Sequence, residues 1–376
     1  MPITNKLQFI YQEKTTRDST RGTDWTQQGT LLDGSKMTPG HEYVMVGWVN
    51  CTSPVGNEGG TKFAFEDGGG DIVGSVHQRH DTNSSGMYVA HIGQFTAPNP
   101  TQSICIYRKM IFDDGGTEET NYGQCFAIDL SYSGASGGLE SGVDWSSSVD
   151  TSARSYSPGQ FFHIHSVDNA SGTNLVLAIA KSYDTMAPTS IGLIVNKTGG
   201  MGDNVVVASG SRYSQDPDDM KSIPFAIVQD MPSGTDIKIK NVDPQTVNTD
   251  YSYIFTLNLD DTPAINATGR LSSWTDHSTS GTWGTKTIDG NNEESFVIAM
   301  GRQLETGVQS GRMASISLLN NTSGDYLTFK ERPSGNYNPL YYPATNPGVN
   351  VGQQEISVVV GVGKIGDADE IEVTTL

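Results

Sequence analysis

The stretch Asp236-Ile-Lys-Ile-Lys240 sets the fold class, because its residues alternate strictly between charged and apolar. Successive side chains of a β-strand point to opposite faces, so the pattern places Ile237 and Ile239 on one face and the charged residues on the other. An α-helix would instead need apolar residues three and four positions apart. The stretch therefore predicts a half-buried strand.

Similar β-branched and aromatic runs recur along the whole chain, and each is bounded by Gly, Pro, Asn or Asp. No window of helical length carries a convincing helical spacing of apolar residues, although residues 175–180 are compatible with a short helix by composition. The sequence therefore predicts an all-β protein. The expected strands include residues 43–49, 62–65, 103–107, 125–130, 161–165, 191–195, 253–257, 295–300, 355–360 and 370–373.

Three parts of the chain share one layout, in which a strand is followed by a polar loop and a tryptophan. The layouts run from residues 6–11 to Trp25, from residues 125–130 to Trp145, and from residues 253–257 to Trp274. The tryptophans are 120 and 129 residues apart, close to one third of the 376-residue chain. We therefore predict a tandem repeat of about 120 residues. The alternative is the generic similarity of strands and turns within any all-β sequence.

A repeat of this size, with seven to nine strands, has the dimensions of a β-sandwich or jelly roll. We expect three tandem jelly-roll-like β-sandwich domains, at residues 1–135, 136–262 and 263–376. Each internal copy of the strand motif could end one domain or begin the next. That motif occurs four times, near Phe9, Phe126, Phe255 and Val358.

The net charge of −19 argues against two classes of partner. Binding to nucleic acid needs basic surface that displaces phosphate counterions, and docking on anionic membranes needs the same sign of charge. No segment approaches the length of apolar sequence that spans a bilayer, and the N-terminal residues lack the apolar core of a secretory signal. We therefore expect synthesis in a cytoplasm without a signal peptide or transmembrane segment, and neither nucleic acid nor membrane as a partner.

The cysteines and histidines do not complete a reactive centre by sequence. Three cysteines are too few for a disulfide framework and lie near apolar runs, which indicates buried thiols. His163 and His165 would share one strand face, as a metal site requires, but no further ligand completes the set, so a solvated or half-buried pair is favoured. His77 and His80 are similarly incomplete. The cysteines are Cys51, Cys105 and Cys125.

We assign no catalytic, cofactor-binding or metal residue. A nucleophile elbow, a P-loop and a dinucleotide fingerprint are all missing from the sequence, and residues 68–70 and 199–200 are typical of loop glycines. Paired acids lie in Gly- and Pro-rich turns, where Asp usually bonds its own backbone. Calcium held by such loops is the one cofactor that the composition suggests. The acidic groups are Asp113–Asp114, Asp216–Asp219, Asp260–Asp261 and Asp367–Glu370.

In general character the chain resembles head-decoration, fibre and other β-rich virion proteins of tailed bacteriophages. The resemblance rests on the Gly-, Ser-, Thr- and Asn-rich composition and on the repeated strand text around Trp25, Trp145 and Trp274. It covers the whole chain and includes no diagnostic motif. It implies a non-enzymatic structural component of a virus particle, in particular a capsid decoration or cement protein that binds the major capsid protein on the outer capsid surface.

Two other functions remain open from the sequence. A carbohydrate- or receptor-binding module of a phage fibre or adhesin would use the 15 Tyr and 5 Trp to bind a surface glycan, for example through the loop at residues 337–342. Tryptophans after the boundary loops could be exposed as sugar platforms, or could cap the end of a sandwich. A β-sandwich hydrolase is the third class, because catalytic acids can lie in loops.

Overall fold

The fold was analysed in a computed structural model, and it is built almost entirely from antiparallel β-sheets. The structure describes residues 9–14, 16, 18–20, 22–52, 58–68, 71–79, 87–110, 118–131, 144–169, 171–183, 189–196, 204–212, 221–241, 246–259, 282–288, 293–305, 316–320, 322, 325–326, 353–366 and 369–375. The all-β prediction is confirmed, and residues 175–180, which could have been helical by composition, lie within a strand. The described part contains one short 3-10 helix, η1 (Gly34–Lys36).

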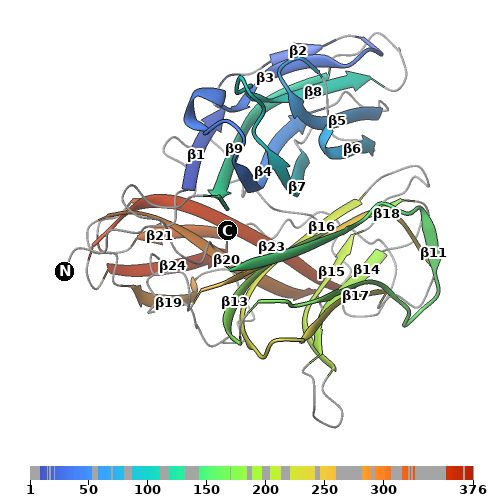
Figure 1. The fold of residues 1–376 in the computed structure, drawn as a ribbon, viewed down its shortest axis with the longest axis vertical. Coiled ribbons are helices and arrows are strands. Elements are labelled where there is room, and N and C mark those ends of the chain that lie inside the picture. The colour runs from blue at the N-terminus through green and yellow to red at the C-terminus, as the bar shows by residue number, and fades with distance from the viewer. Residues whose placement is uncertain are drawn as a thin grey trace.

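The first nine strands form two sheets that face each other (Figure 1). One sheet has the order β1-β9-β4-β7, with β2 also paired to β9, and the other has the order β3-β8-β5-β6. The strands are β1 (Phe9–Lys14), β2 (Asp18–Thr20), β3 (Thr26–Leu32), β4 (Glu42–Thr52), β5 (Glu58–Phe65), β6 (Asp71–Arg79), β7 (Met87–Thr96), β8 (Ile104–Met110) and β9 (Glu118–Asp129). We call this pair of sheets the first sandwich.

The next nine strands repeat this topology strand for strand. Their sheets have the orders β10-β18-β13-β16, with β11 also paired to β18, and β12-β17-β14-β15. The strands are β10 (Trp145–Asp150), β11 (Arg154–Tyr156), β12 (Phe161–Ser166), β13 (Gly172–Tyr183), β14 (Thr189–Asn196), β15 (Asn204–Arg212), β16 (Lys221–Met231), β17 (Asp236–Asn241) and β18 (Val247–Asn258). We call this pair the second sandwich.

The last six strands form a four-stranded sheet, β19-β24-β21-β22, and the pair β20-β23. We call these two sheets the third sandwich. Its strands are β19 (Thr282–Ile288), β20 (Glu293–Glu305), β21 (Ile316–Asn320), β22 (Asp325–Tyr326), β23 (Gln353–Ile365) and β24 (Asp369–Thr375). No described strand pair crosses the predicted boundaries at residues 135/136 and 262/263. The boundaries themselves lie outside the described residues and stay predictions, as does the count of three repeats.

The topology corrects one detail of the sequence alignment. Strands β9 and β18 pair with earlier strands, so the motifs near Phe126 and Phe255 each complete a sandwich. The motif near Val358 lies on β23, which pairs with β20 and is followed by β24, so its place is that of β7 and β16. Apolar strand sequences look alike whether they lie in the middle or at the side of a sheet, and this similarity caused the misalignment.

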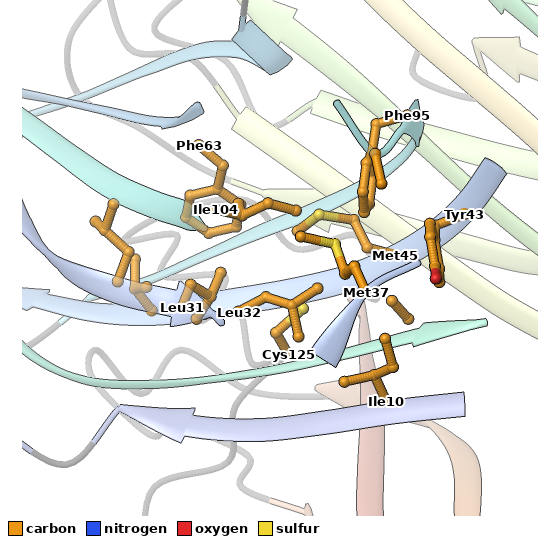
Figure 2. Packing of buried hydrophobic residues seen from close by; sticks show 14 residues of the cluster. Ile10, Leu31, Leu32, Met37, Tyr43, Met45, Phe63, Phe95, Ile104 and Cys125 are labelled. Atoms are coloured by element: carbon orange, nitrogen blue, oxygen red, sulfur yellow. The ribbon is translucent and has the colours of Figure 1, made fainter. Parts of the chain in front are cut away.

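The core of the first sandwich lies between its two sheets (Figure 2). Tyr43 and Met45 of β4, Phe63 of β5 and Phe95 of β7 are among its buried members. The rings of Tyr43 and Phe95 stack with their centroids 5.4 Å apart. The Tyr43 hydroxyl accepts a hydrogen bond of 2.9 Å from the backbone N–H of Thr38, so its polar end is satisfied within the core.

Strand β4 is buried on both faces, which explains why its sequence is continuously apolar. Tyr43 and Met45 face the core, whereas Val44 and Val46 lie on the opposite face and are 0% and 3% exposed. Alternation is expected only where one face of a strand meets water. Strand β17, by contrast, follows the predicted alternation, because Ile237 and Ile239 are fully buried whereas Lys238 and Lys240 are partly exposed.

The second sandwich contacts both of its neighbours along the chain. Strand β7 of the first sandwich lies against β13 and β16, and β15 and β16 lie against β23 of the third sandwich. In Figure 1 the first sandwich, drawn in blue to cyan, stands above the green and yellow strands of the second. The side of β7 that faces away from the core of the first sandwich is therefore covered by the second sandwich.

Candidate functional site

A cluster of serine and histidine side chains with potential chemistry lies at one edge of the second sandwich. It joins β10, the edge strand of one sheet, to β12, the edge strand of the other. Ser146 and Ser148 alternate with Ser147 on β10, so both serines point to the same side, toward the histidines of β12. The histidines are His163 and His165, the pair that the sequence singled out.

Each histidine is bonded to a serine of the facing sheet. His163 Nε2 lies 2.8 Å from Ser148 Oγ, and His163 Nδ1 lies 2.8 Å from Ser252 Oγ on β18. His165 Nε2 lies 3.0 Å from Ser146 Oγ, which also lies 2.8 Å from Thr256 Oγ1. These bonds tie the two sheets together through side chains. Five residues on β10, β12 and β18 form this set of bonds, and we call them the serine–histidine network. They are Ser146, Ser148, His163, His165 and Ser252.

Burial controls the charge of both imidazoles. His163 and His165 are only 6% and 5% exposed, so the expected solvated or half-buried pair is in fact buried. Burial lowers the pKa of His163 to about 4, while the nearby Asp150 carboxylate opposes this shift and His165 adds to it. Burial also lowers the pKa of His165, and Asp168 opposes that shift. Both rings are therefore neutral at neutral pH.

The pairing of Ser148 with His163 has the geometry of a nucleophile with its base, but its surroundings indicate a structural role. A catalytic base is usually oriented by a third group, often a carboxylate, whereas Nδ1 of His163 meets the hydroxyl of Ser252. The same kind of pair is repeated one step along the strands by Ser146 and His165. Two parallel pairs of one kind satisfy buried polar atoms and fix strand register, which is the usual consequence of such networks.

A second polar cluster lies where the first sandwich meets the second. The Gln94 side-chain oxygen on β7 accepts hydrogen bonds from Ser147 Oγ at 2.7 Å and from Tyr253 Oη at 3.0 Å. Gln94 also donates through Nε2 to the carboxylate of Glu42 on β4. The Tyr251 hydroxyl donates to the backbone carbonyl of Ile92 at 3.4 Å. One glutamine thus joins two strands of the second sandwich to the first.

Two buried basic side chains lie near this contact, Lys181 within it and His91 on the opposite, core-facing side of β7. Lys181 of β13 is 1% exposed, and its ammonium group lies 4.8 Å from the centroid of the Tyr251 ring. His91 of β7 is fully buried, and its ring centroid lies 4.2 Å from that of Phe63. Neither ring nitrogen of His91 has a hydrogen-bond partner within the described part of the chain. Burial, and then the charge of Lys181, lower the pKa of His91 well below its ordinary value.

The two tryptophans whose side chains the structure describes, Trp25 and Trp145, are engaged within the chain. The ammonium groups of Lys62 and Lys109 lie 5.2 and 4.9 Å from the centroid of the Trp25 ring. The Trp145 ring stacks on Phe255 with their centroids 6.0 Å apart. Cation and ring contacts of this kind hold a tryptophan against its own sheet. Both tryptophans are nevertheless partly exposed.

The cysteine prediction holds for the two thiols whose surroundings are described. Cys105 and Cys125 are free and buried. Burial raises the pKa of Cys105 to about 11 and raises that of Cys125 still further. Since the thiolate is the reactive form, these cysteines are poor nucleophiles and poor metal ligands at neutral pH. Cys51 lies on β4, and its side chain is outside the described set.

Several residues singled out by sequence fall elsewhere or outside the described ranges. His77 lies on β6, and Gly68 has a positive φ of 73° in the turn after β5, as expected of a loop glycine. Asp369 accepts a 2.7 Å hydrogen bond from the backbone N–H of Gly366, which is the turn role expected of these acids. The rest lie outside the described residues: His80, residues 69–70, 113–114, 199–200, 216–219, 260–261 and 367–368, Trp274 and residues 337–342.

The described residues hold no group of three or more His, Cys, Asp or Glu side chains arranged to bind a metal ion. The same ranges contain no helix that is both long and apolar enough to cross a membrane. The polar residues that sequence reasoning missed are the serines of β10 and Gln94. The sequence did contain a pattern that could have identified the serines, because Ser146, Ser148 and Asp150 are spaced two residues apart, as are side chains on one face of a strand.

The fold and these clusters define the chain as an antiparallel β-sandwich protein in which serine and histidine side chains form hydrogen bonds between the two sheets of the second sandwich. No family model and no curated protein matches the chain. Among solved structures, it is similar to the tandem CBM22 domains of Xyn10C from Paenibacillus barcinonensis, with 10% identity and a TM-score of 0.22 over 68% of this chain and 99% of that chain.

Two further solved structures represent the other kinds of match. One is BuGH86 in complex with neoagarooctaose, with 9% identity and a TM-score of 0.23 over 63% of this chain and 34% of that chain. The other is the T13 particle of the infectious bursal disease virus IBDV, with 9% identity and a TM-score of 0.23 over 99% of this chain and 78% of that chain. Likenesses with TM-scores this low carry no argument about function.

Proposed function

We propose that the chain is a non-enzymatic structural component of a virus particle, and in particular a decoration protein that binds the major capsid protein on the outer surface of the capsid. The observation that supports this proposal is the internal engagement of the two histidines of β12 and the burial of two cysteine thiols. His163 and His165 are bonded to serines, and Cys105 and Cys125 are buried thiols with raised pKa values. Residues used in this way stabilise a body and do not act on a substrate.

The contact between the first two sandwiches supports the same function. Gln94 is hydrogen-bonded to Ser147 and Tyr253, and Tyr251 reaches the backbone of β7, so the second sandwich is held to the first through specific bonds. A decoration protein acts through its shape and its strand edges, which requires that its parts keep fixed positions. The charge of −19 keeps such a protein soluble before it assembles.

Co-sedimentation with separated particle parts tests the proposal. The purified chain is mixed with empty capsids that lack tails and, separately, with purified tails from the virus preparation that contains it. We expect saturable binding to empty capsids, with a fixed number of copies per particle. Binding to tails alone would contradict capsid decoration, and binding to neither part would contradict a structural role in the particle.

A glycan array serves as the counter-test for the alternative function. The rings of Trp25 and Trp145 are engaged by Lys62 and Lys109 and by Phe255, respectively, so we expect no retention that depends on Trp25 or Trp145. Retention that is lost in Trp25→Ala, but kept in the buried-core control Phe63→Leu, would favour a carbohydrate-binding module over decoration.

A further inference from the structure

Two large apolar side chains are exposed within the part of the chain that the structure describes. Val149 of β10 is 57% exposed and lies on the face of that strand that contacts the first sandwich. Ile164 of β12 is 54% exposed and alternates with the buried His163 and His165. Ile164 therefore lies on the outer face of the sheet β12-β17-β14-β15. An exposed isoleucine by itself needs no explanation, so its surroundings decide whether it marks a binding surface.

An aromatic ring and two lysines share this face with Ile164. Phe161, at the start of β12, lies opposite Lys240 of β17, and Ile164 lies opposite Lys238. The ammonium groups of Lys238 and Lys240 lie 5.2 and 5.3 Å from the centroid of the Phe161 ring. Aliphatic, aromatic and basic groups thus meet on two neighbouring strands. We call Phe161, Ile164, Lys238 and Lys240 the outer patch of the second sandwich.

The first sandwich has a cluster of the same kind at the equivalent place, and the comparison isolates what is unusual about the second. Trp25 directly precedes β3, the strand that holds the place of β12, and the ammonium groups of Lys62 and Lys109 lie near its ring. Trp25 is partly exposed, and the neighbouring Tyr107 is 7% exposed. A ring with two lysines is therefore found without an exposed aliphatic side chain. Ile164 is the feature that only the outer patch adds among these two described clusters.

The described charges of this sheet favour an acidic partner. Its four strands contain three basic residues and one acidic residue: Asp236, Lys238, Lys240 and Arg212. Asp236 lies 3.4 Å from Lys238 and also accepts a hydrogen bond from Ser166, at the end of β12 that precedes the exposed Asp168. Lys240, at the Phe161 end, forms no ion pair within the described part of the chain, and Asp243 lies outside that part. The patch is therefore basic at its Phe161 end.

We propose that the outer patch binds an extended acidic segment of a partner protein, with an aliphatic side chain of the segment against Ile164 and its carboxylates at Lys238 and Lys240. The two lysines are two residues apart on one strand, about 7 Å, which is also the spacing of alternate side chains in an extended segment. The net charge of −19 does not prevent this contact, because charges more than about 8 Å away are largely screened at physiological ionic strength. Exchanging the surface ion pair between Asp236 and Lys238 costs little.

A partner polypeptide fits the patch better than a second copy or an acidic polysaccharide. Two copies joined patch to patch would place lysines against lysines. Val149, the other described exposed aliphatic side chain, is followed by Asp150 and Arg154, which have opposite charges, so it does not offer an acidic aliphatic segment. Ile164 has no group that bonds a sugar hydroxyl. This inference does not rest on the proposed decoration function.

Nuclear magnetic resonance of the full chain, labelled at its isoleucine methyl groups, tests the proposal. The probes are the peptide Thr-Leu-Thr-Glu-Thr-Glu-Thr and its reversed sequence, which cover both directions of binding. We expect at least one probe to shift the Ile164 methyl signal in a saturable way. The signals of Ile237 and Ile239, which are buried in the same sheet, should not move and show that the fold is intact. The same peptides with lysine in place of glutamate should cause no shift.

Paired charge variants separate local recognition from general attraction. Lys238→Gln with Lys240→Gln should weaken binding of the acidic probe by about fivefold or more. The matched control, Lys62→Gln with Lys109→Gln, removes the equivalent lysines of the first sandwich and should leave binding unchanged.

Four outcomes would overturn the proposal. The first is an Ile164 signal that neither acidic probe moves, and the second is an equal shift with the lysine peptides or equal weakening in the control variant. A third is tighter binding of an oligogalacturonate than of the acidic peptides, which would assign the patch to an acidic polysaccharide. The last is an Ile164 signal that shifts on dilution of the chain alone while sedimentation shows a dimer, which would assign it to a second copy.

Discussion

Gln94 forms side-chain hydrogen bonds with residues far along the chain. Its side-chain oxygen accepts hydrogen bonds from the hydroxyls of Ser147 and Tyr253. The Tyr253 side chain is buried, and this burial raises the pKa of its hydroxyl above the ordinary value. A buried hydroxyl that loses its acceptor keeps the full cost of its desolvation. Gln94 therefore contributes to stability largely because it provides a hydrogen-bond acceptor for the buried hydroxyl of Tyr253 and for that of Ser147.

Replacing Gln94 by Leu should destabilise the protein by about 1–3 kcal/mol, because Ser147 and Tyr253 would lose their acceptor. Equilibrium unfolding in urea measures the change. The matched control is Gln102→Ala, whose side chain bonds Asp67 at an exposed site and should change stability by less than about 0.5 kcal/mol. A Gln94 variant as stable as the control would show that the hydroxyls find other partners.

At the scale of single elements, strand β10 adds side-chain hydrogen bonds between two sheets that the bond of Ser252 with His163 also joins. Its alternate serines reach His163 and His165 on β12, while Ser147 between them points to the first sandwich. One short strand thus has a polar contact on each face. Its sequence, Trp-Ser-Ser-Ser-Val-Asp, contains little apolar surface, so hydrogen bonds determine its position.

The variant Ser148→Ala should reduce the free energy of unfolding by about 1–3 kcal/mol, because it leaves Nε2 of the buried His163 without a partner. The exposed Ser157→Ala is the control, with an expected change within about 0.5 kcal/mol. Combining Ser148→Ala with His163→Ala should cost less than the sum of the single changes, since both remove one bond. Additive effects would show that the two side chains do not interact in solution.

The strands were far easier to predict than the contacts between them. The alternation in residues 236–240 and the apolar run at 43–49 each depend on a few neighbouring residues, and both are strands. The pairing of Ser148 with His163 depends on which sheet edges face each other, which no local pattern encodes. The motif near Val358 was misaligned for the same reason, because a central strand and its neighbour can carry the same apolar text.

For the molecule as a whole, three buried histidines contribute to the loss of stability just below neutral pH. His91, His163 and His165 have lowered pKa values in the fold, so they stay neutral there at pH values where the unfolded chain takes up protons. The unfolded state then binds more protons than the folded state, and stability falls as the pH falls. The effect begins near the ordinary histidine pKa of about 6.5.

We therefore expect the free energy of unfolding to fall between pH 7 and pH 5 by up to about 1.4 kcal/mol per pH unit for each of the three histidines. Urea unfolding at closely spaced pH values measures the slope, and for His163 the loss should continue to about pH 4. The double variant His163→Gln and His165→Gln should have a shallower slope than the parent chain. A parent chain equally stable at pH 7 and pH 5 would contradict the neutral, buried state of these rings.

The bond between Gln94 and Tyr253 also has a consequence for synthesis on the ribosome. The two residues are 159 positions apart, so at ordinary elongation rates of about 5–20 residues per second the partner emerges about 8–32 s after Gln94 does. During that interval the nascent first sandwich has the side of β7 that carries Ile92 and Gln94 uncovered. The early chain is therefore the form most in need of chaperones, and stopping translation before β18 should yield a product that aggregates more readily than the finished protein.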